Sequence, residues 1–297
     1  MKILLTGCTG QVGQEIQRRS AAYDFQIVAY SHSTLDISKM EQVASVFEHE
    51  KIDLVINAAA YTAVDKAESE QDIAFSANSA GIENLALQAK KHDIPVFHIS
   101  TDYVFDGEST VAYSETSETN PTTVYGASKL DGEQRLSSML NNHIILRTSW
   151  VFGIDGNNFV KTMLRLGDAH KELRVVADQL GNPSFAGSIA DALLKMANQY
   201  QQEKTLPWGL YHYCNNSATT WHSFAEHITS LGHKYNLIEN IPIVKPILTS
   251  EFPTEASRPR FSSLDNSHFK ATFPQIEIAG WQEALEHVIS TLSGENS

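Results

Sequence analysis

The first 150 residues alternate short apolar runs with longer amphipathic stretches. The apolar runs cover residues 2–7, 25–30, 53–60, 96–100 and 143–149, and helical patterns fall near 11–21, 38–50, 70–92 and 122–140. Strands separated by helical segments of this length form βαβ units and hence a parallel sheet. Because the strands are almost continuously apolar, helices are expected on both faces of that sheet. The predicted fold class is therefore α/β, with a Rossmann-type doubly wound parallel sheet.

The pattern becomes less regular after residue 150. Further strands are expected in "LRVVAD", "GLYHYC" and "IPIVKPIL", mixed with helices near 157–167, 186–202, 219–231 and 279–292. Seven of the nine prolines also fall in this half, mostly in expected loops. We predict a main domain over residues 1–150 and a smaller, less regular lobe over 151–297, with later segments that rejoin the main sheet.

Charge and composition exclude several classes of protein. The net charge of −13 argues against nucleic acid as a partner, because phosphate backbones require clustered basic residues. Two cysteines, Cys8 and Cys214, imply no disulfide framework and favour a reducing compartment. The N-terminal apolar run is too short for a signal peptide, and no stretch of 18 apolar residues predicts a membrane span. We expect a soluble cytoplasmic protein.

A glycine-rich segment, "GCTGQVG" at residues 7–13, follows the first expected strand and opens a helix. In this context Gly7 allows a tight turn, Gly10 lets the backbone approach a pyrophosphate, and Gly13 lets the helix pack closely. The helix N-terminus adds free N–H groups and a partial positive charge. The segment predicts dinucleotide binding, so we assign residues 1–150 to NAD(P) and interpret residues 151–297 as a mainly substrate-binding lobe.

The end of the second strand bears on the choice of cofactor. A strict NAD enzyme often places an acid there for the ribose hydroxyls, but the chain reads "AYSHST", with neither acid nor arginine. Ser31 and His32 could tolerate a 2′-phosphate. NADPH is therefore favoured, with NADH possible, and Asp36 is a candidate adenine contact.

Tyr125 and Lys129 lie four residues apart in "YGASK", so one helix face would carry both side chains. A nearby ammonium lowers the pKa of a tyrosine, and such a tyrosine can protonate a carbonyl oxygen while a nicotinamide donates hydride. Thr101 ends the fourth expected strand in "VFHISTDYVFDG", where its hydroxyl could hydrogen-bond the same carbonyl.

Five segments, "GCTGQVG", "NAAAYTAVDKAE", "STDYVFDG", "YGASK" and "RTSWVFG", occur in order and at matching intervals. Together with the late segment "ASRPRFSSLDNSHF", they resemble the extended short-chain dehydrogenases/reductases, and within them the dTDP-4-dehydrorhamnose reductase family. The resemblance implies that Thr101, Tyr125 and Lys129 are catalytic. Implied cofactor contacts are Gly7, Gly10, Gln11, Val12, Gly13, Asp36, Ile37, Ala60, Tyr61, Thr62, Asn78 and Lys129. Implied substrate contacts are Val64, Thr101, Asp102, Tyr103, Tyr125 and Trp150, and Arg258 is a candidate for the substrate diphosphate, as is Arg260.

The same resemblance implies NAD(P)H-dependent reduction of the C4 ketone of dTDP-4-dehydro-L-rhamnose to dTDP-L-rhamnose, a precursor of cell-surface polysaccharide, with Tyr125 as proton donor. Related 4,6-dehydratases need an adjacent Asp and Glu after the threonine, whereas Asp102 is followed here by Tyr103. Three alternatives stay open: a reductase that forms talose, a reductase or epimerase of another nucleotide sugar, and a non-catalytic NADP-binding subunit similar to the β subunit of methionine adenosyltransferase.

Some members of this family join two subunits through a divalent metal held by glutamates. Glu15 stands where the first such ligand would be, but residues 187–189 read Gly-Ser-Ile, and Glu283 and Glu286 lie on an ordinary amphipathic helix. Mg²⁺ therefore stays open with Glu15 as a weak candidate, no metal site is predicted, and either a monomer or a homodimer is expected.

Overall fold

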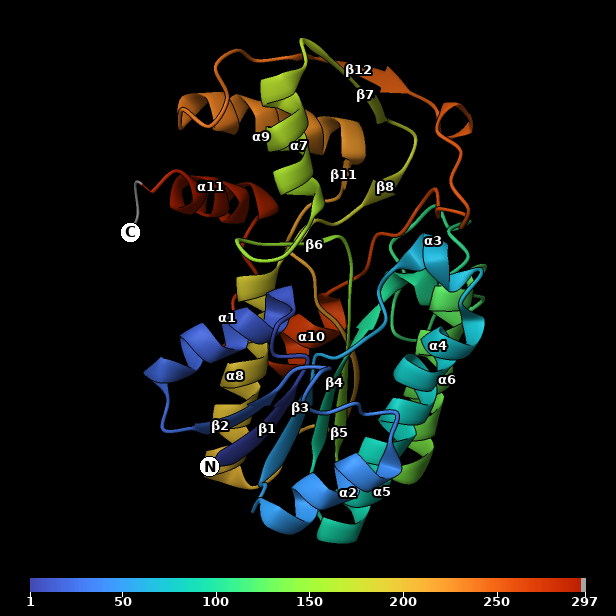
Figure 1. The fold of residues 1–297 in the computed structure, drawn as a ribbon, viewed down its shortest axis with the longest axis vertical. Coiled ribbons are helices and arrows are strands. Elements are labelled where there is room, and N and C mark those ends of the chain that lie inside the picture. The colour runs from blue at the N-terminus through green and yellow to red at the C-terminus, as the bar shows by residue number, and fades with distance from the viewer. Residues whose placement is uncertain (295–297) are drawn as a thin grey trace.

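A six-stranded parallel sheet forms the centre of the computed structural model, which describes residues 1–294 (Figure 1). Its strands follow the order β10-β5-β4-β3-β1-β2. They are β1 (Lys2–Thr6), β2 (Gln26–Tyr30), β3 (Leu54–Asn57), β4 (Val96–Thr101), β5 (His143–Thr148) and β10 (Gly209–His212). All five pairings between neighbouring strands are parallel. The expected α/β fold class is confirmed, and the first five strands lie where the sequence predicts them.

The order of the strands determines where a ligand can bind. β1 lies between β2 and β3, so the chain leaves β1 in one direction and returns on its other side. Ligands of open α/β sheets bind beyond the carboxyl ends of the strands at such a switch point. The ends of β1, β3 and β4 are therefore the expected floor of a site.

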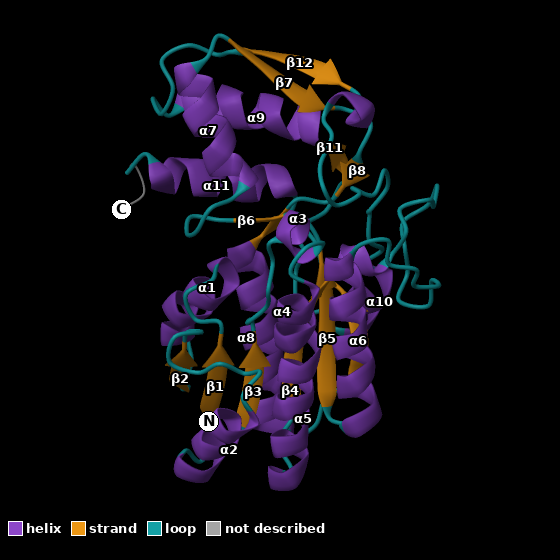
Figure 2. Cartoon of the chain, turned by 45° about the vertical axis from the view of Figure 1, so that its right-hand side comes forward, coloured by secondary structure: helices purple, strands orange, loops and turns teal. Residues whose placement is uncertain are grey.

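Helices cover both faces of the sheet, as Figure 2 shows. Alternate residues of β1 point to opposite faces: Ile3 and Leu5 pack with α1 (Gln11–Arg19), α8 (Ala186–Glu203) and α10 (Ser267–Thr272), and Leu4 packs with the opposite layer. That layer consists of α2 (Met40–His49), α5 (Gly81–His92) and α6 (Val124–Met139). Two buried layers explain the apolar strands.

A second lobe stands over the carboxyl ends of the strands and has its own apolar core (Figure 1). Its helices are α7 (Phe159–Ala169), α9 (Trp221–Lys234) and α11 (Trp281–Leu292). Its strands form three short pairs: β7 (Glu172–Val176) with β12 (Ile243–Ile247), β8 (Leu180–Gly181) with β11 (Thr219–Thr220), and β6 (Val151–Phe152) with β9 (Ser184–Phe185).

The chain returns from this lobe to the main sheet, where β10 pairs with β5 and α8 packs against α1. The assignment of cofactor to residues 1–150 and of substrate mainly to 151–297 stays a prediction, and residues 295–297 lie outside the described part. Among residues 1–294, no helix combines the length and hydropathy needed to cross a membrane.

The remaining helical pieces are three to five residues long. They are η1 (Ser20–Ala22), α3 (Val64–Ala67), α4 (Gln71–Phe75), the π-helical turn η2 (Ser76–Ala80), η3 (Asp102–Val104) and η4 (Thr249–Glu251). Of these, η2 and η3 contact α6, the helix that carries the expected tyrosine and lysine.

A buried ion pair attaches α6 to β5. The Glu133 carboxylate accepts hydrogen bonds from Arg147 Nε at 2.9 and 3.2 Å and from Arg147 Nη2 at 2.6 Å. Both residues are almost inaccessible, with exposed fractions of 4% and 3%. The guanidinium also lies over the Phe105 ring, 5.1 Å from its centroid. Removal of either partner would leave a buried charge without compensation.

We therefore expect Arg147→Met to lower the free energy of unfolding by about 3–5 kcal/mol, because Glu133 stays buried without its partner. The double variant with Glu133→Leu should recover most of the loss, since it buries no charge. Arg174→Met breaks the exposed pair with Glu251 and serves as control, with a change below about 1 kcal/mol. Urea unfolding followed by circular dichroism measures all three, and a double variant no more stable than Arg147→Met would contradict this account.

Candidate functional site

The glycine-rich segment forms a tight turn between β1 and α1. Gly7 has a φ of 71°, in the left-handed region that favours glycine. A Cβ on Gly13 would lie 2.2 Å from the Gly7 carbonyl oxygen, so only glycine lets α1 approach the turn this closely. Gly10 is the N-cap of α1 and offers no side chain to the first-turn N–H groups. Those groups are left for an anion.

A groove of about 390 Å³ opens beside this turn, at the carboxyl ends of β1 and β3. Six of the residues that the resemblance implies for the cofactor line it, namely Gly7, Gly10, Asp36, Ile37, Ala60 and Tyr61. His32 lines it too, and the Asp36 carboxylate accepts bonds from Ser38 N and Oγ at 3.0 and 2.7 Å. The dimensions and the free N–H groups suit a dinucleotide.

The other implied cofactor residues lie outside the lining of the groove. Val12 and Gly13 are buried in α1, and Thr62 is exposed beyond β3. Gln11 connects the lobes: its Oε1 accepts from Asn158 Nδ2 at 2.9 Å, and its Nε2 donates to the Val151 carbonyl at 3.4 Å.

Thr101, Asp102 and Tyr125 meet at the carboxyl end of β4. Thr101 Oγ1 donates to Asp102 Oδ1 at 3.0 Å and accepts from the backbone N–H of Tyr103 at 3.2 Å, which caps η3. The Tyr125 ring packs edge-on against Tyr103, with centroids 5.5 Å apart. The strand end of the "VFHISTDYVFDG" segment thus supplies a buried hydroxyl and carboxyl beside the phenol.

The protonation of this cluster differs from the expectation. Burial raises the pKa of Tyr125 to about 12, although the neighbouring Thr101 hydroxyl acts in the opposite direction. The expected lowering of the pKa by Lys129 is wrong for these side-chain positions, and Tyr125 is a neutral phenol. Burial also raises the pKa of Asp102 to about 6, although the neighbouring Ser262 and Thr101 hydroxyls act in the opposite direction.

The Lys129 amino group lies one helical turn from Tyr125, beneath the end of β4. Its Nζ donates to the Ile99 carbonyl at 2.7 Å and lies 3.2 Å from His98 Nε2. The residue is 2% exposed, and burial lowers the pKa of the amine to about 8, although Glu133 acts in the opposite direction.

Asn78 lies on the π-helical turn η2 and is buried, with 1% exposed. Its side chain accepts from Tyr61 N at 2.8 Å and donates to Tyr61 O at 3.0 Å and to Ser128 Oγ at 3.0 Å. These bonds hold the loop after β3 against α6. The contact on α6 is Ser128, the residue that precedes Lys129 in the chain.

Three implied substrate residues, Trp150, Val64 and Tyr103, follow the carboxyl ends of β5, β3 and β4. Trp150 has a φ of 47°, and its indole stacks on Trp221 with centroids 3.5 Å apart. Val64 packs in the same apolar cluster as Tyr125 and Tyr103. The Tyr103 phenol is half-buried, and burial raises its pKa.

Arg258 lies against the main domain, where its Nη2 forms a 2.7 Å ion pair with Asp65 of α3. The Asp65 carboxylate also accepts from Ala256 N at 3.1 Å. A diphosphate at Arg258 would therefore share it with a carboxylate. Arg260 is exposed.

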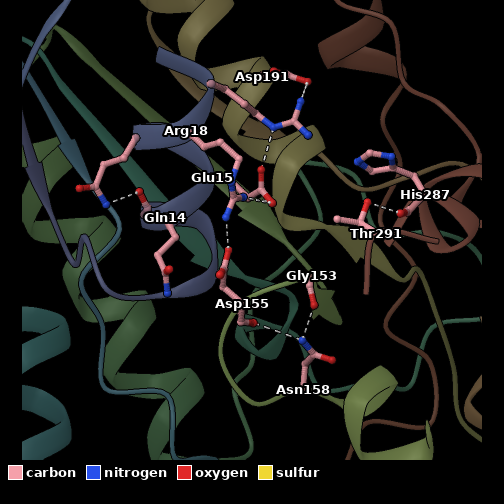
Figure 3. Close-up of polar contacts among 12 residues, drawn as sticks. Gln14, Glu15, Arg18, Gly153, Asp155, Asn158, Asp191, His287 and Thr291 are labelled. Carbon is pink, nitrogen blue, oxygen red and sulfur yellow. Dashed lines mark hydrogen bonds and ion pairs between the residues drawn. The ribbon is translucent and has the colours of Figure 1, made fainter. Parts of the chain in front are cut away.

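Glu15 does not fit a metal site. Arg18 Nη1 lies 2.7 Å and Arg19 Nε 2.9 Å from its carboxylate oxygens, so two guanidinium groups occupy the position of a cation. Arg18 and Arg19 also reach Asp155 and Asp191 (Figure 3). Within residues 1–294 no three His, Cys, Asp or Glu side chains are grouped to hold a metal.

A second candidate carboxylate is also engaged by other side chains. Glu286 accepts from Lys234 Nζ at 2.5 Å and from Tyr235 Oη at 2.9 Å, on the second lobe. Ser188, in the segment expected to hold the second ligand, instead contacts Asn215 Nδ2 at 3.3 Å.

Several side chains of the site were not predicted from the sequence. His98 and Asn57 lie behind Lys129, Asp65 pairs with Arg258, and Trp221 stacks on Trp150. A polar His inside the otherwise apolar strand "VFHIS" and an Asn at the end of "DLVIN" were the available signals. The Asp65 and Trp221 contacts join residues far apart in the chain and had no local signal.

Comparison with known proteins agrees with this geometry. Residues 1–293 match the family described as the RmlD substrate binding domain. A dTDP-4-dehydrorhamnose reductase of Aggregatibacter actinomycetemcomitans is 40% identical over 288 residues, which cover 97% of this chain and 98% of that protein. The chain belongs to the dTDP-4-dehydrorhamnose reductase family. The corresponding Escherichia coli protein is 39% identical over 295 residues, 98% of each chain.

Solved structures of this family share the whole fold. A dTDP-4-dehydrorhamnose reductase from Clostridium acetobutylicum superposes with a TM-score of 0.91 at 38% identity, over 98% of this chain and 99% of that one. The Bacillus anthracis reductase, solved in complex with NADP, gives 0.88 at 34% identity, over 97% and 98%. A UDP-glucose 4-epimerase from Thermus thermophilus, at 18% identity, shares the fold alone.

The glycine turn predicts a contrast between two substitutions. Gly13→Ala places its Cβ 2.2 Å from the Gly7 carbonyl and should lower both thermal stability and NADPH affinity. A Cβ at position 10 would contact only the Gly7 carbonyl oxygen, at 3.3 Å. Gly10→Ala should therefore chiefly weaken NADPH binding, at nearly unchanged melting temperature. Thermal melts and NADPH fluorescence titration test this. A Gly13→Ala variant with unchanged melting temperature would be inconsistent with the close approach.

Burial of Lys129 predicts that its removal changes the free energy of unfolding by an amount that depends on pH. The unfolded lysine holds its proton up to about its ordinary value of 10.5, whereas the folded one loses it near 8. The unfolded state thus binds more protons in this window, and wild-type stability rises with pH across it. The stability of Lys129→Met relative to wild type should therefore fall between pH 8 and 10.5, by up to about 3 kcal/mol. Urea unfolding across this range measures it, with exposed Lys195→Met as control; a flat difference would contradict the prediction.

Proposed function

We propose that the protein reduces the C4 ketone of dTDP-4-dehydro-L-rhamnose to dTDP-L-rhamnose, with hydride from NADPH. The observation that carries the proposal is the buried cluster of Thr101, Tyr125 and Lys129 at the carboxyl end of β4, in a chain that matches dTDP-4-dehydrorhamnose reductases over nearly its full length. In this scheme residues 1–150 bind the cofactor and 151–297 bind mainly the nucleotide sugar.

The arrangement supports reduction in which protein side chains supply the proton. The nicotinamide cofactor would supply hydride to C4 of the sugar. Tyr125 is neutral at physiological pH, so its phenol can give a proton to the C4 oxygen as negative charge develops there. The O–H bond of the phenol breaks and an O–H bond to the sugar forms. Thr101 would release its hydrogen bond to Asp102 and donate the same proton to the C4 oxygen.

The cofactor site favours NADPH. A loop of hydroxyl side chains follows β2: Ser31 Oγ lies 2.8 Å from Ser33 Oγ and 3.2 Å from Thr34 Oγ1, and no carboxylate lies at the strand end. The nearest acid on the groove, Asp36, is engaged by Ser38. The Bacillus anthracis relative binds NADP. We therefore assign His32 and the loop hydroxyls to the 2′-phosphate, with NADH as a weaker donor.

The substrate diphosphate is assigned to Arg258. Its positive charge lowers the pKa of Tyr103, against the effect of burial. The ion pair with Asp65 holds this guanidinium in place, and Trp150, which packs between Gly181 and Trp221, supplies a rigid wall for the sugar.

Tyr125→Phe tests the proposal directly. Loss of the proton donor should lower kcat about 10²–10⁴-fold, with NADPH affinity unchanged because the hydroxyl is the only atom removed. The protein is incubated with dTDP-glucose, the two upstream enzymes and NADPH or NADH, and nicotinamide absorbance is followed. Tyr23→Phe, on the far side of the sheet, is the control.

The product sugar is then analysed, because rhamnose and 6-deoxytalose differ only in the configuration at C4. No oxidation of either cofactor by wild-type protein, despite tight NADPH binding, would refute the assignment and favour a non-catalytic subunit.

A further inference from the structure

A row of buried polar side chains runs behind the proposed proton donor, across β1, β3, β4 and α6. Thr6 Oγ1 donates to Asn57 Oδ1, Asn57 Nδ2 lies 2.8 Å from His98 Nδ1, and His98 Nε2 lies 3.2 Å from Lys129 Nζ. The exposed fractions are 1% for Thr6, 0% for Asn57 and His98, and 2% for Lys129. Four polar groups in a dry interior must match donors with acceptors.

The orientation of the Asn57 amide follows from its second neighbour. The backbone N–H of Ala59 contacts Asn57 Oδ1 at 3.3 Å, and the Ala59 carbonyl contacts Nδ2 at 3.4 Å. A backbone N–H can only donate and a carbonyl can only accept, so the side-chain oxygen faces the former and the nitrogen the latter. The hydrogen bond from Thr6 Oγ1 to Asn57 Oδ1 is consistent with this orientation.

The amide orientation determines the tautomer of His98. Because Asn57 Nδ2 donates toward His98, Nδ1 must accept and carries no proton. Burial holds the pKa of His98 well below its usual value, so the ring is neutral and its one proton lies on Nε2. That N–H points at Lys129.

An ammonium cannot accept this hydrogen bond, because it has three donors and no lone pair. A neutral amine can accept from His98 Nε2–H and still donate to the Ile99 carbonyl at 2.7 Å. The contacts around Lys129 are thus satisfied when the amine is neutral and conflict when it is protonated.

Other titratable groups near this row do not remove the conflict. Glu133, one turn further along α6, favours the ammonium but is already bound by Arg147 through three hydrogen bonds. His143 on β5 affects His98 and is itself held below its usual pKa by burial. Tyr125, one turn back, is a neutral phenol.

We propose that His98, oriented by Asn57, is a positioning residue that holds the Lys129 amino group and disfavours its protonation. The consequence for turnover rests on the proposed function, whereas the tautomer of His98 does not. When the amine takes a proton from solvent, the ammonium so formed can pass that proton to the Tyr125 phenolate left by each reduction, and the amine is then neutral again. The upper pH limit of activity would then report the proton affinity of Lys129.

Asn57→Asp reverses the donor pattern with almost no change in shape. A carboxylate only accepts, so His98 must present Nδ1–H to it and turn the Nε2 lone pair to Lys129. His98→Gln removes the imidazole without adding charge. For both variants we expect the upper limb of the kcat–pH profile to move up by about one pH unit or more. His143→Gln, which lacks the Lys129 contact, should leave the limb in place.

A merely structural role would lower kcat at every pH without moving the limb, and that result would overturn the proposal. The tautomer is measured separately in ¹⁵N-labelled wild-type protein by long-range ¹H–¹⁵N spectra, with the His98 signals identified by their loss in His98→Gln. A proton on Nε2 at pH 7 supports the proposal, and a proton on Nδ1 or an imidazolium overturns it. If the wild type reduces no substrate, the proposed function fails but the spectra still decide the tautomer. If a variant does not fold, the spectra of the wild type decide alone.

Discussion

The position of α6 on the sheet depends on the buried ion pair between Glu133 and Arg147. A buried pair of charges is stable when good geometry compensates for the loss of water, and here three hydrogen bonds join the two groups, although Arg147 Nη1 has no partner among residues 1–294. Tyr125, Lys129 and Glu133 follow one another at intervals of four residues, so they form a row along one face of the helix. The pair at one end of this row sets the depth at which the amine reaches Ile99 and the phenol reaches Thr101.

Burial then controls the chemistry of that row. The same exclusion of water raises the pKa of Tyr125 and lowers that of Lys129, so both groups are driven toward their neutral forms. The sequence pattern suggested a charged lysine that acidifies the tyrosine, since it showed only their spacing. The structure instead places Lys129 against the Ile99 carbonyl and the His98 imidazole. These contacts depend on how deeply the side chain is buried, which the spacing of residues along the helix does not show.

Features encoded by neighbouring residues could be predicted well. The glycine turn, the strand ends and the Tyr–Lys pair depend on periodicity and on local conformation, and each lies where the motifs place it. Partners that come from distant segments could not be predicted. Asp65 and Arg258 are 193 positions apart, and no residue near either of them in the sequence predicts their contact. Glu15 was a weak metal candidate because the family resemblance places the first metal-ligating glutamate there, and the sequence did not show that Arg18 and Arg19 would both pair with it.

The sequence by itself determined the order of strands and helices, the dinucleotide turn and the identity of the proposed catalytic groups, because these depend on short-range patterns of apolar, glycine and polar residues. Only the tertiary structure decided the protonation of those groups and the partners of Arg258, Glu15 and His98. Proton affinity depends on how completely water is excluded and on which donors and acceptors converge from separate strands. Both are properties of the packed chain.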